Sequence, residues 1–145
     1  MRQCDWDEVA YTLYDATRRW RRSELNLMAS GKIEPYERWV RMGAKELADR
    51  LRDYEIYDDV AQPPLGRDAI AALFAAVLIG WPLTLRRRLA SPISEGRREA
   101  RIVAAISLAE ALDRFTILRD SPPPPPFMFL RTDGGTGLAP REEIG

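Results

Sequence analysis

Histidine is absent from this chain of 145 residues, and cysteine occurs once, as Cys4. A catalytic thiol needs a nearby base or positive charge that favours the thiolate, and no histidine can take that role here. A single cysteine also cannot form a disulfide within the chain. These absences argue against enzymes that depend on histidine or on an activated thiol, and we predict no catalytic residue.

Motifs that hold cofactors or metal ions are missing as well. Gly134, Gly135 and Gly137 do not open a helix after a strand, so they do not match a nucleotide-binding loop. Asp58 and Asp59 belong to an acidic stretch, but they lack the glycine-turn spacing of a calcium loop. We therefore expect a protein that has no cofactor and no metal ion and that is not an enzyme.

Lysine is scarce, because 20 of the 22 basic residues are arginine, and 22 acidic residues bring the formal net charge to zero. A balanced charge gives no strong overall attraction to nucleic acid. The amino-terminal stretch MRQCDWDEVA has no apolar run of the kind that directs export. We expect a cytoplasmic location, or membership of a particle that is assembled in the cytoplasm.

Helical periodicity dominates what is present. Asp5 followed by Glu8 is typical of a helix start, and apolar residues at steps of three and four predict one long helix from Trp6 to Ala29. Pro35 opens a second helix. One face of the second helix is apolar and carries Val40, Ala44, Leu47, Leu51 and Tyr54. Pairs spaced four residues apart predict ion pairs on its other faces: Glu34 with Arg38, Glu37 with Arg41, and Glu46 with Arg50.

The longest uncharged run extends from Ala69 to Leu85. We predict that it forms the central helix of a bundle, with a kink at Gly80 and Pro82. A membrane-spanning helix is the alternative for residues 69–85. At 1.5 Å per residue the run rises only about 25 Å, which is less than the roughly 30 Å of a bilayer's hydrocarbon core. The length therefore favours the bundle.

Ser91 and Pro92 are typical of a helix start and predict a fourth helix that runs to Leu118. Five consecutive prolines, Pro122 to Pro126, then predict an extended polyproline II segment. The predicted fold is all-α. A bundle-like domain of four helices occupies residues 1–120, its central helix kinked and apolar, and a proline-rich arm occupies residues 121–145.

Two sets of residues are candidates for binding a partner. The first set is an apolar tetrapeptide on the arm, which would be costly to leave in water: Phe127, Met128, Phe129 and Leu130. The second set is basic and could bind an anion or a partner: Arg18, Arg22, Arg86, Arg87 and Arg88. Acidic residues interrupt the basic stretches, so we expect only weak binding to nucleic acid.

These features predict a non-enzymatic component that works through protein-protein interaction. An assembly subunit or adaptor fits best, such as a subunit of a larger complex of the kind found in phage particles, and its partner is another protein or a second copy of the chain. The alternatives are a small membrane-attached protein that uses residues 69–85, a nucleic-acid-binding protein that uses the arginines, and an inhibitor of a host enzyme.

Overall fold

The computed structural model describes residues 2–120, which are mostly helical and carry a small antiparallel sheet. The predicted predominance of helix is therefore confirmed, whereas the sheet is not part of the predicted all-α fold. In chain order, the elements are β1 (Arg2–Gln3), α1 (Trp6–Thr17), α2 (Arg22–Met28), α3 (Ile33–Arg50), β2 (Tyr54–Tyr57), α4 (Arg67–Ile79), α5 (Leu83–Leu89), α6 (Ser94–Glu110) and β3 (Thr116–Arg119).

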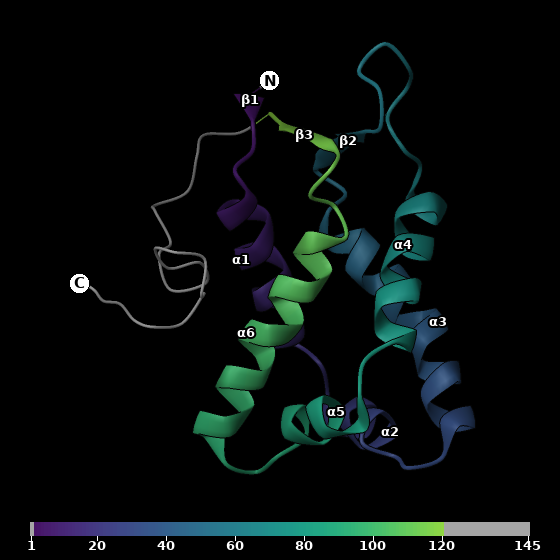
Figure 1. Cartoon of the computed structure of the whole chain (residues 1–145), viewed down its shortest axis with the longest axis vertical. Helices are drawn as coiled ribbons and strands as arrows, with labels where there is room; N and C mark the ends of the chain where they lie inside the picture. Colours follow the sequence, from purple (N-terminus) through teal and green to yellow (C-terminus); the bar gives the residue numbers. More distant parts are fainter. Residues whose placement is uncertain (1, 121–145) are drawn as a thin grey trace, which may run out of the picture.

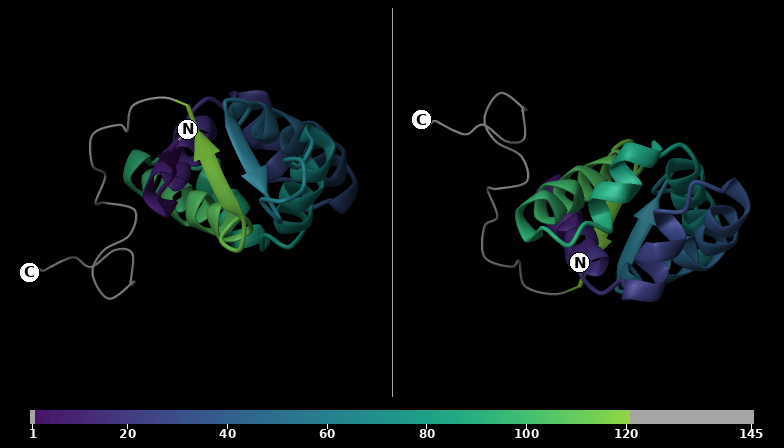
Figure 2. Two further views of the ribbon diagram at one scale, coloured as in Figure 1. Left: turned by 90° about the horizontal axis from the view of Figure 1, so that it is seen from above. Right: turned by 90° about the horizontal axis from the view of Figure 1, so that it is seen from below.

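The four longer helices run along the length of the molecule, between the sheet at one end and the short helices α2 and α5 at the other (Figure 1). Helix α3 packs along α4, and α1 packs along α6, and these are the two most extensive helix pairings. Seen from above the sheet, β2 and β3 lie side by side across the top of the helices (Figure 2). The apolar core fills the space between the helix pairs and under the sheet.

The sheet has the strand order β1, β3, β2, and all neighbouring strands are antiparallel. Strand β2 has the sequence YEIY, in which Tyr54 and Ile56 are buried while Glu55 and Tyr57 are only partly covered. This alternation follows from the two-residue period of a strand, which sends successive side chains to opposite faces. Ile56 pairs directly with Ile117 of β3.

The chain contains an internal repeat that relates its two halves. The order α1, α2, α3, β2 recurs as α4, α5, α6, β3, with helices and strands of nearly equal length. Several residues are identical at a separation of 61 positions: Ala10 and Ala71, Trp20 and Trp81, Ala29 and Ala90, Ser30 and Ser91, Leu47 and Leu108, Ala48 and Ala109, Leu51 and Leu112, Ile56 and Ile117. Because Ile56 and Ile117 occupy the same position in the repeat and also face each other, an approximate twofold axis passes between them.

The predicted long helix from Trp6 to Ala29 is wrong, because residues 18–21 separate α1 from α2. The break turns Trp20 into the core. There its ring packs edge-on against Trp39 at 5.2 Å and lies 6.3 Å from Trp81, measured between ring centroids. A straight helix could not place Trp20 in this cluster and also direct α2 across the end of the molecule.

The apolar run from Ala69 to Leu85 is not a central helix. Ile70, Phe74 and Leu78 are buried against the rest of the protein, whereas the opposite side of α4, including Ala72 and Ala76, is exposed. Mostly small side chains face outward, which keeps the apolar area in contact with water low.

The predicted interruption at Gly80 and Pro82 is confirmed, since α4 ends at Ile79 and α5 begins at Leu83. Within residues 2–120 no single helix is long and apolar enough to cross a membrane. Helices α4 and α5 meet that length only as a pair, and the pair is bent by 104°.

The last helix is shorter than predicted. It ends at Glu110, and residues 116–119 form strand β3 in place of a continued helix to Leu118. The predicted arm, residues 121–145, lies outside the described residues.

Candidate functional site

An apolar groove lies between α2 and α3. Its volume is about 350 Å³, and its lining residues are Leu27, Pro35, Arg38, Trp39, Arg41 and Met42. Pro35 stands in the first turn of α3, so the next two turns of that helix carry Trp39 and Met42 along one side of the groove. Leu27 is 38% exposed and Met42 is 56% exposed, which is high for large apolar side chains.

The two arginines at the edge of this groove have no ion-pair partner among the described residues. No ion pair between residues 2 and 120 involves Arg38 or Arg41, so the predicted pairs Glu34 with Arg38 and Glu37 with Arg41 are absent from this part of the chain. Two guanidinium groups that lack an acidic partner in this part of the chain, placed beside an apolar surface, favour a ligand that carries both apolar and acidic groups.

In the second half of the repeat, different residues occupy the positions that line this groove. Leu27 and Arg38 correspond by position to Arg88 and Glu99, which form an ion pair at 3.2 Å. Met42 corresponds to Val103, which is less exposed at 39%. The equivalent positions of the second half thus carry an ion pair and a less exposed apolar side chain. The groove is a local departure from the repeat, which the common fold does not require.

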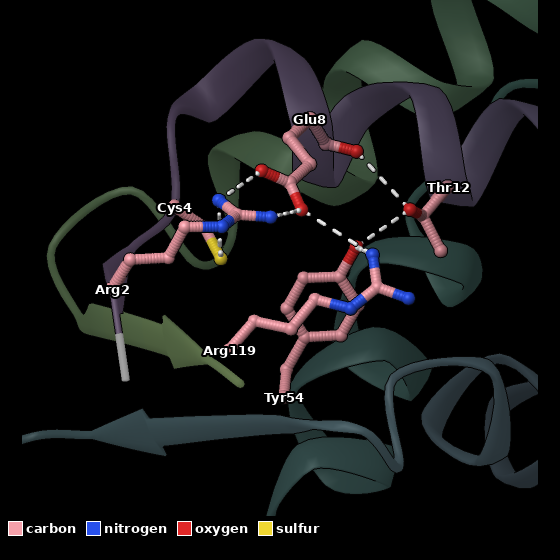
Figure 3. Close-up of polar contacts among 6 residues, drawn as sticks. All are labelled: Arg2, Cys4, Glu8, Thr12, Tyr54 and Arg119. Atoms are coloured by element: carbon pink, nitrogen blue, oxygen red, sulfur yellow. Dashed lines mark hydrogen bonds and ion pairs between the residues drawn. The ribbon is translucent and has the colours of Figure 1, made fainter. Parts of the chain in front are cut away.

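A polar cluster beneath the sheet was not predicted. Glu8 of α1 is buried, and the Arg2 guanidinium binds both of its carboxylate oxygens, at 2.8 and 3.0 Å (Figure 3). Arg119 of β3 donates to the same carboxylate at 3.3 Å. The hydrogen bond from Arg2, with a further contribution from Arg119, holds the pKa of Glu8 below its usual value.

The cluster extends to Tyr54 of β2. The Arg119 guanidinium lies 4.7 Å from the centre of the Tyr54 ring and donates to the Tyr54 hydroxyl at 3.1 Å. That hydroxyl also shares a hydrogen bond of 2.8 Å with Thr12 of α1. Figure 3 shows these side chains directed toward one another from three elements.

The chemistry of the cluster suits a structural role. Its one carboxylate, Glu8, is ionised and neutralised by two guanidinium groups. Burial raises the pKa of the Cys4 thiol, which disfavours the reactive thiolate. The arrangement joins α1 to strands β1 and β3 and presents no activated nucleophile or base.

The predicted arginine patch does not form as one surface. Arg86 is buried, where it donates to the Met28 carbonyl at 2.9 Å and lies 4.0 Å from the centre of the Tyr36 ring. Arg22 donates to the Ala90 carbonyl at 2.7 Å, and Arg88 binds Glu99. Arg86 is thus separated from the exposed Arg87 and Arg88, because it packs α5 against α2 and α3.

The other predicted site residues have separate positions. Arg18 is exposed and lies 3.7 Å from Asp15, and Arg87 is exposed on α5. Phe127, Met128, Phe129 and Leu130 lie outside the described residues. Across the described part of the chain, no group of three acidic, cysteine or histidine side chains could hold a metal ion.

The internal repeat is the sequence signal that could have located the unpredicted residues. Glu8 corresponds by position to Ala69, and Tyr54 corresponds to Phe115. A polar residue at a position where the other half is apolar marks a feature that the common fold does not need.

No protein-family model, no curated protein and no solved structure matches this chain.

Proposed function

We propose that this protein is a non-enzymatic assembly subunit or adaptor that receives a segment of a protein partner in the groove between α2 and α3. The observation that carries the proposal is the exposure of Leu27 and Met42 beside Arg38 and Arg41, which form no ion pair within residues 2–120. Exposed apolar surface with a polar edge is typical of interaction sites.

The chemistry of the groove defines the partner segment. One large apolar side chain would fill the space between Leu27, Trp39 and Met42, and burying it would contribute about 1.5–3 kcal/mol before ordering costs. Acidic residues on either side of that anchor would pair with Arg38 and Arg41. The proposed partner segment is therefore a short apolar and acidic stretch, supplied by another protein or by a second copy of the chain.

The arm belongs to the same proposal. The finer fold assignment, a bundle-like helical body in residues 1–120 and an extended arm in residues 121–145, would give the protein a second element with which to bind. Phe127 and Phe129 are its proposed anchors. A component with one receiving surface and one projecting apolar segment suits a subunit of a larger complex, such as a phage-like particle assembled in the cytoplasm.

A crosslinking experiment tests the groove. A photo-reactive amino acid at position 42 is compared with the same amino acid at position 103, its counterpart in the second half. We expect a specific partner, or a second copy, to be captured in the native source from position 42 only. Met42→Glu should weaken that association by at least about tenfold, because it places a carboxylate against the apolar surface. Val103→Glu should leave it unchanged.

Two results would contradict the proposal. One is equal capture from positions 42 and 103. The other is an association that survives Met42→Glu, which would move the interface away from the groove. Sedimentation of the purified protein with and without residues 121–145 then reports whether the arm contributes to the same association.

A further inference from the structure

The pairing of α1 with α6 differs chemically from its counterpart in the repeat. In the pairing of α3 with α4, Tyr36 and Val40 are buried, and the Tyr36 hydroxyl donates to the Leu78 carbonyl of α4. The same positions on α6 hold Arg97 and Arg101. Charged residues thus occupy a helix interface at positions where the other half places core residues.

Arg97 and Arg101 are one helical turn apart and each is half-buried. Burial lowers the pKa of the Arg101 guanidinium, the positive charges of Arg97 and Arg18 lower it further, and Tyr14 of α1 raises it. Arg18 directly follows α1, at the position that corresponds to Ile79. The antiparallel packing of α1 on α6 brings its end beside the first turns of α6 (Figure 1).

Within the described residues, two of these three charges have no acidic partner. No ion pair in residues 2–120 includes Arg97 or Arg101. Asp15 lies 3.7 Å from Arg18, but it also binds Arg19, at 3.4 Å. Arg97 donates to the Ser91 carbonyl at 2.9 Å, which orients its side chain without cancelling its charge. Like charges held together in a partly buried place repel one another unless an anion is present.

We propose that Arg18, Arg97 and Arg101 form a binding site for the phosphate group of a small molecule. Guanidinium groups present several planar N–H donors, a geometry that matches phosphate oxygens. Three of them would neutralise a doubly charged phosphate and remove the repulsion between them. The site uses α1 and α6, whereas the groove uses α2 and α3, so the two proposals are independent.

The test uses the full chain and inorganic phosphate as the probe. Melting temperature is measured in phosphate and in chloride at equal ionic strength, and phosphate affinity is measured by calorimetric titration. Phosphate should raise the melting temperature of the wild-type protein, because binding to the folded state stabilises it. Arg97→Gln combined with Arg101→Gln should abolish that rise and weaken binding by about tenfold or more. In chloride this variant should melt no lower than the wild type, since it relieves repulsion.

A matched control is the pair Arg38→Gln and Arg41→Gln, which removes from α3 two arginines that form no ion pair in residues 2–120. It should keep the full response to phosphate. Arg18→Gln gives a second variant at an exposed position, where folding is not at risk, and it should weaken the response as well.

The proposal is overturned if the wild-type protein shows no difference between phosphate and chloride, or if all variants respond equally. It is also overturned if the three arginines are needed for binding duplex DNA while inorganic phosphate has no effect. In that case the surface would serve a nucleic acid and not a small phosphate compound.

Discussion

The Glu8 carboxylate connects parts of the chain that are far apart in sequence. Through Arg2 and Arg119 it joins α1 to the first and last strands of the sheet. The two arginine side chains are 27% and 28% exposed, while that of Glu8 is 7% exposed. The contact therefore lies at the boundary of the core, where an ion pair is only partly weakened by water.

Replacing Glu8 with glutamine should destabilise the protein at neutral pH by about 1–2 kcal/mol, because charge-assisted hydrogen bonds to a buried group are lost. The folded protein lowers the pKa of Glu8, so the stabilisation is present above the pKa of an unfolded glutamate and is lost as pH falls through the folded value. Urea unfolding from neutral to acidic pH should show the two proteins converging at the acidic end.

Asp15→Asn is the control for this prediction. Asp15 pairs with Arg19 at the surface, and exposed pairs contribute little, so the change should cost well under about 1 kcal/mol. A Glu8→Gln penalty that is constant over the whole pH range would contradict the assignment of the effect to the carboxylate charge.

The burial and capping roles of single residues were predicted well where they depend on local sequence pattern. The apolar face of the second helix, from Val40 to Leu51, is buried as expected. Asp5 is the N-cap residue of α1, as predicted, but its side chain makes no capping hydrogen bond. Glu8 instead binds two arginines, one of them more than a hundred positions away. No local pattern could reveal that contact, because it depends on how β3 returns to α1.

At the scale of elements, the two helix breaks have a common cause. The break between α4 and α5 contains Gly80 and Pro82, which local pattern predicts correctly. The break between α1 and α2 falls at the same position of the repeat, yet Arg21 stands where Pro82 stands in the second half. Because the first half bends without a proline, we infer that the packing of Trp20 against Trp81 sets both bends.

Pro82→Ala should consequently leave the bend in place. We expect its stability to change by less than about 1 kcal/mol and its helical content, measured by circular dichroism, to stay the same. Trp81→Ala should cost about 3–5 kcal/mol, since it empties a large buried volume. A marked gain of helix in Pro82→Ala would show that proline, and not tryptophan packing, sets the bend.

The strands were missed for a related reason. Tyr54–Tyr57 and Thr116–Arg119 are only four residues long, and each follows a long helix, so their alternation is easily taken for a helix end. Their hydrogen-bonding partners are distant in the chain. Pairing of that kind depends on the tertiary fold more than on local preference.

At the scale of the whole molecule, each half of the repeat packs its first helix against the third helix of the other half. Helix α1 of the first half packs on α6 of the second, and α4 of the second packs on α3 of the first. Each half by itself would expose the face that its partner covers. The repeat could have been found from residue identities at a constant separation, and it would have corrected the prediction of a single central helix.

A cut in the exposed loop between β2 and α4 should test this interdependence. Residues 1–60 and 61–145, expressed separately, should show little stable helix as monomers. When mixed they should form a one-to-one complex with the helical content of the intact chain, measured by circular dichroism and sedimentation. If residues 1–60 alone fold into a stable monomer, the two halves do not depend on each other as the packing indicates.

The packing of helices between the two halves also determines when each helix is covered during translation. While the ribosome has released only the first half, α1 and α3 lack the helices that cover them in the finished protein. Helix α4 can cover α3 soon afterwards, but α6, the partner of α1, ends only at Glu110. The apolar face of α1 therefore remains uncovered, and available to chaperones, until α6 has been synthesised. Folding is completed only after translation of the second half.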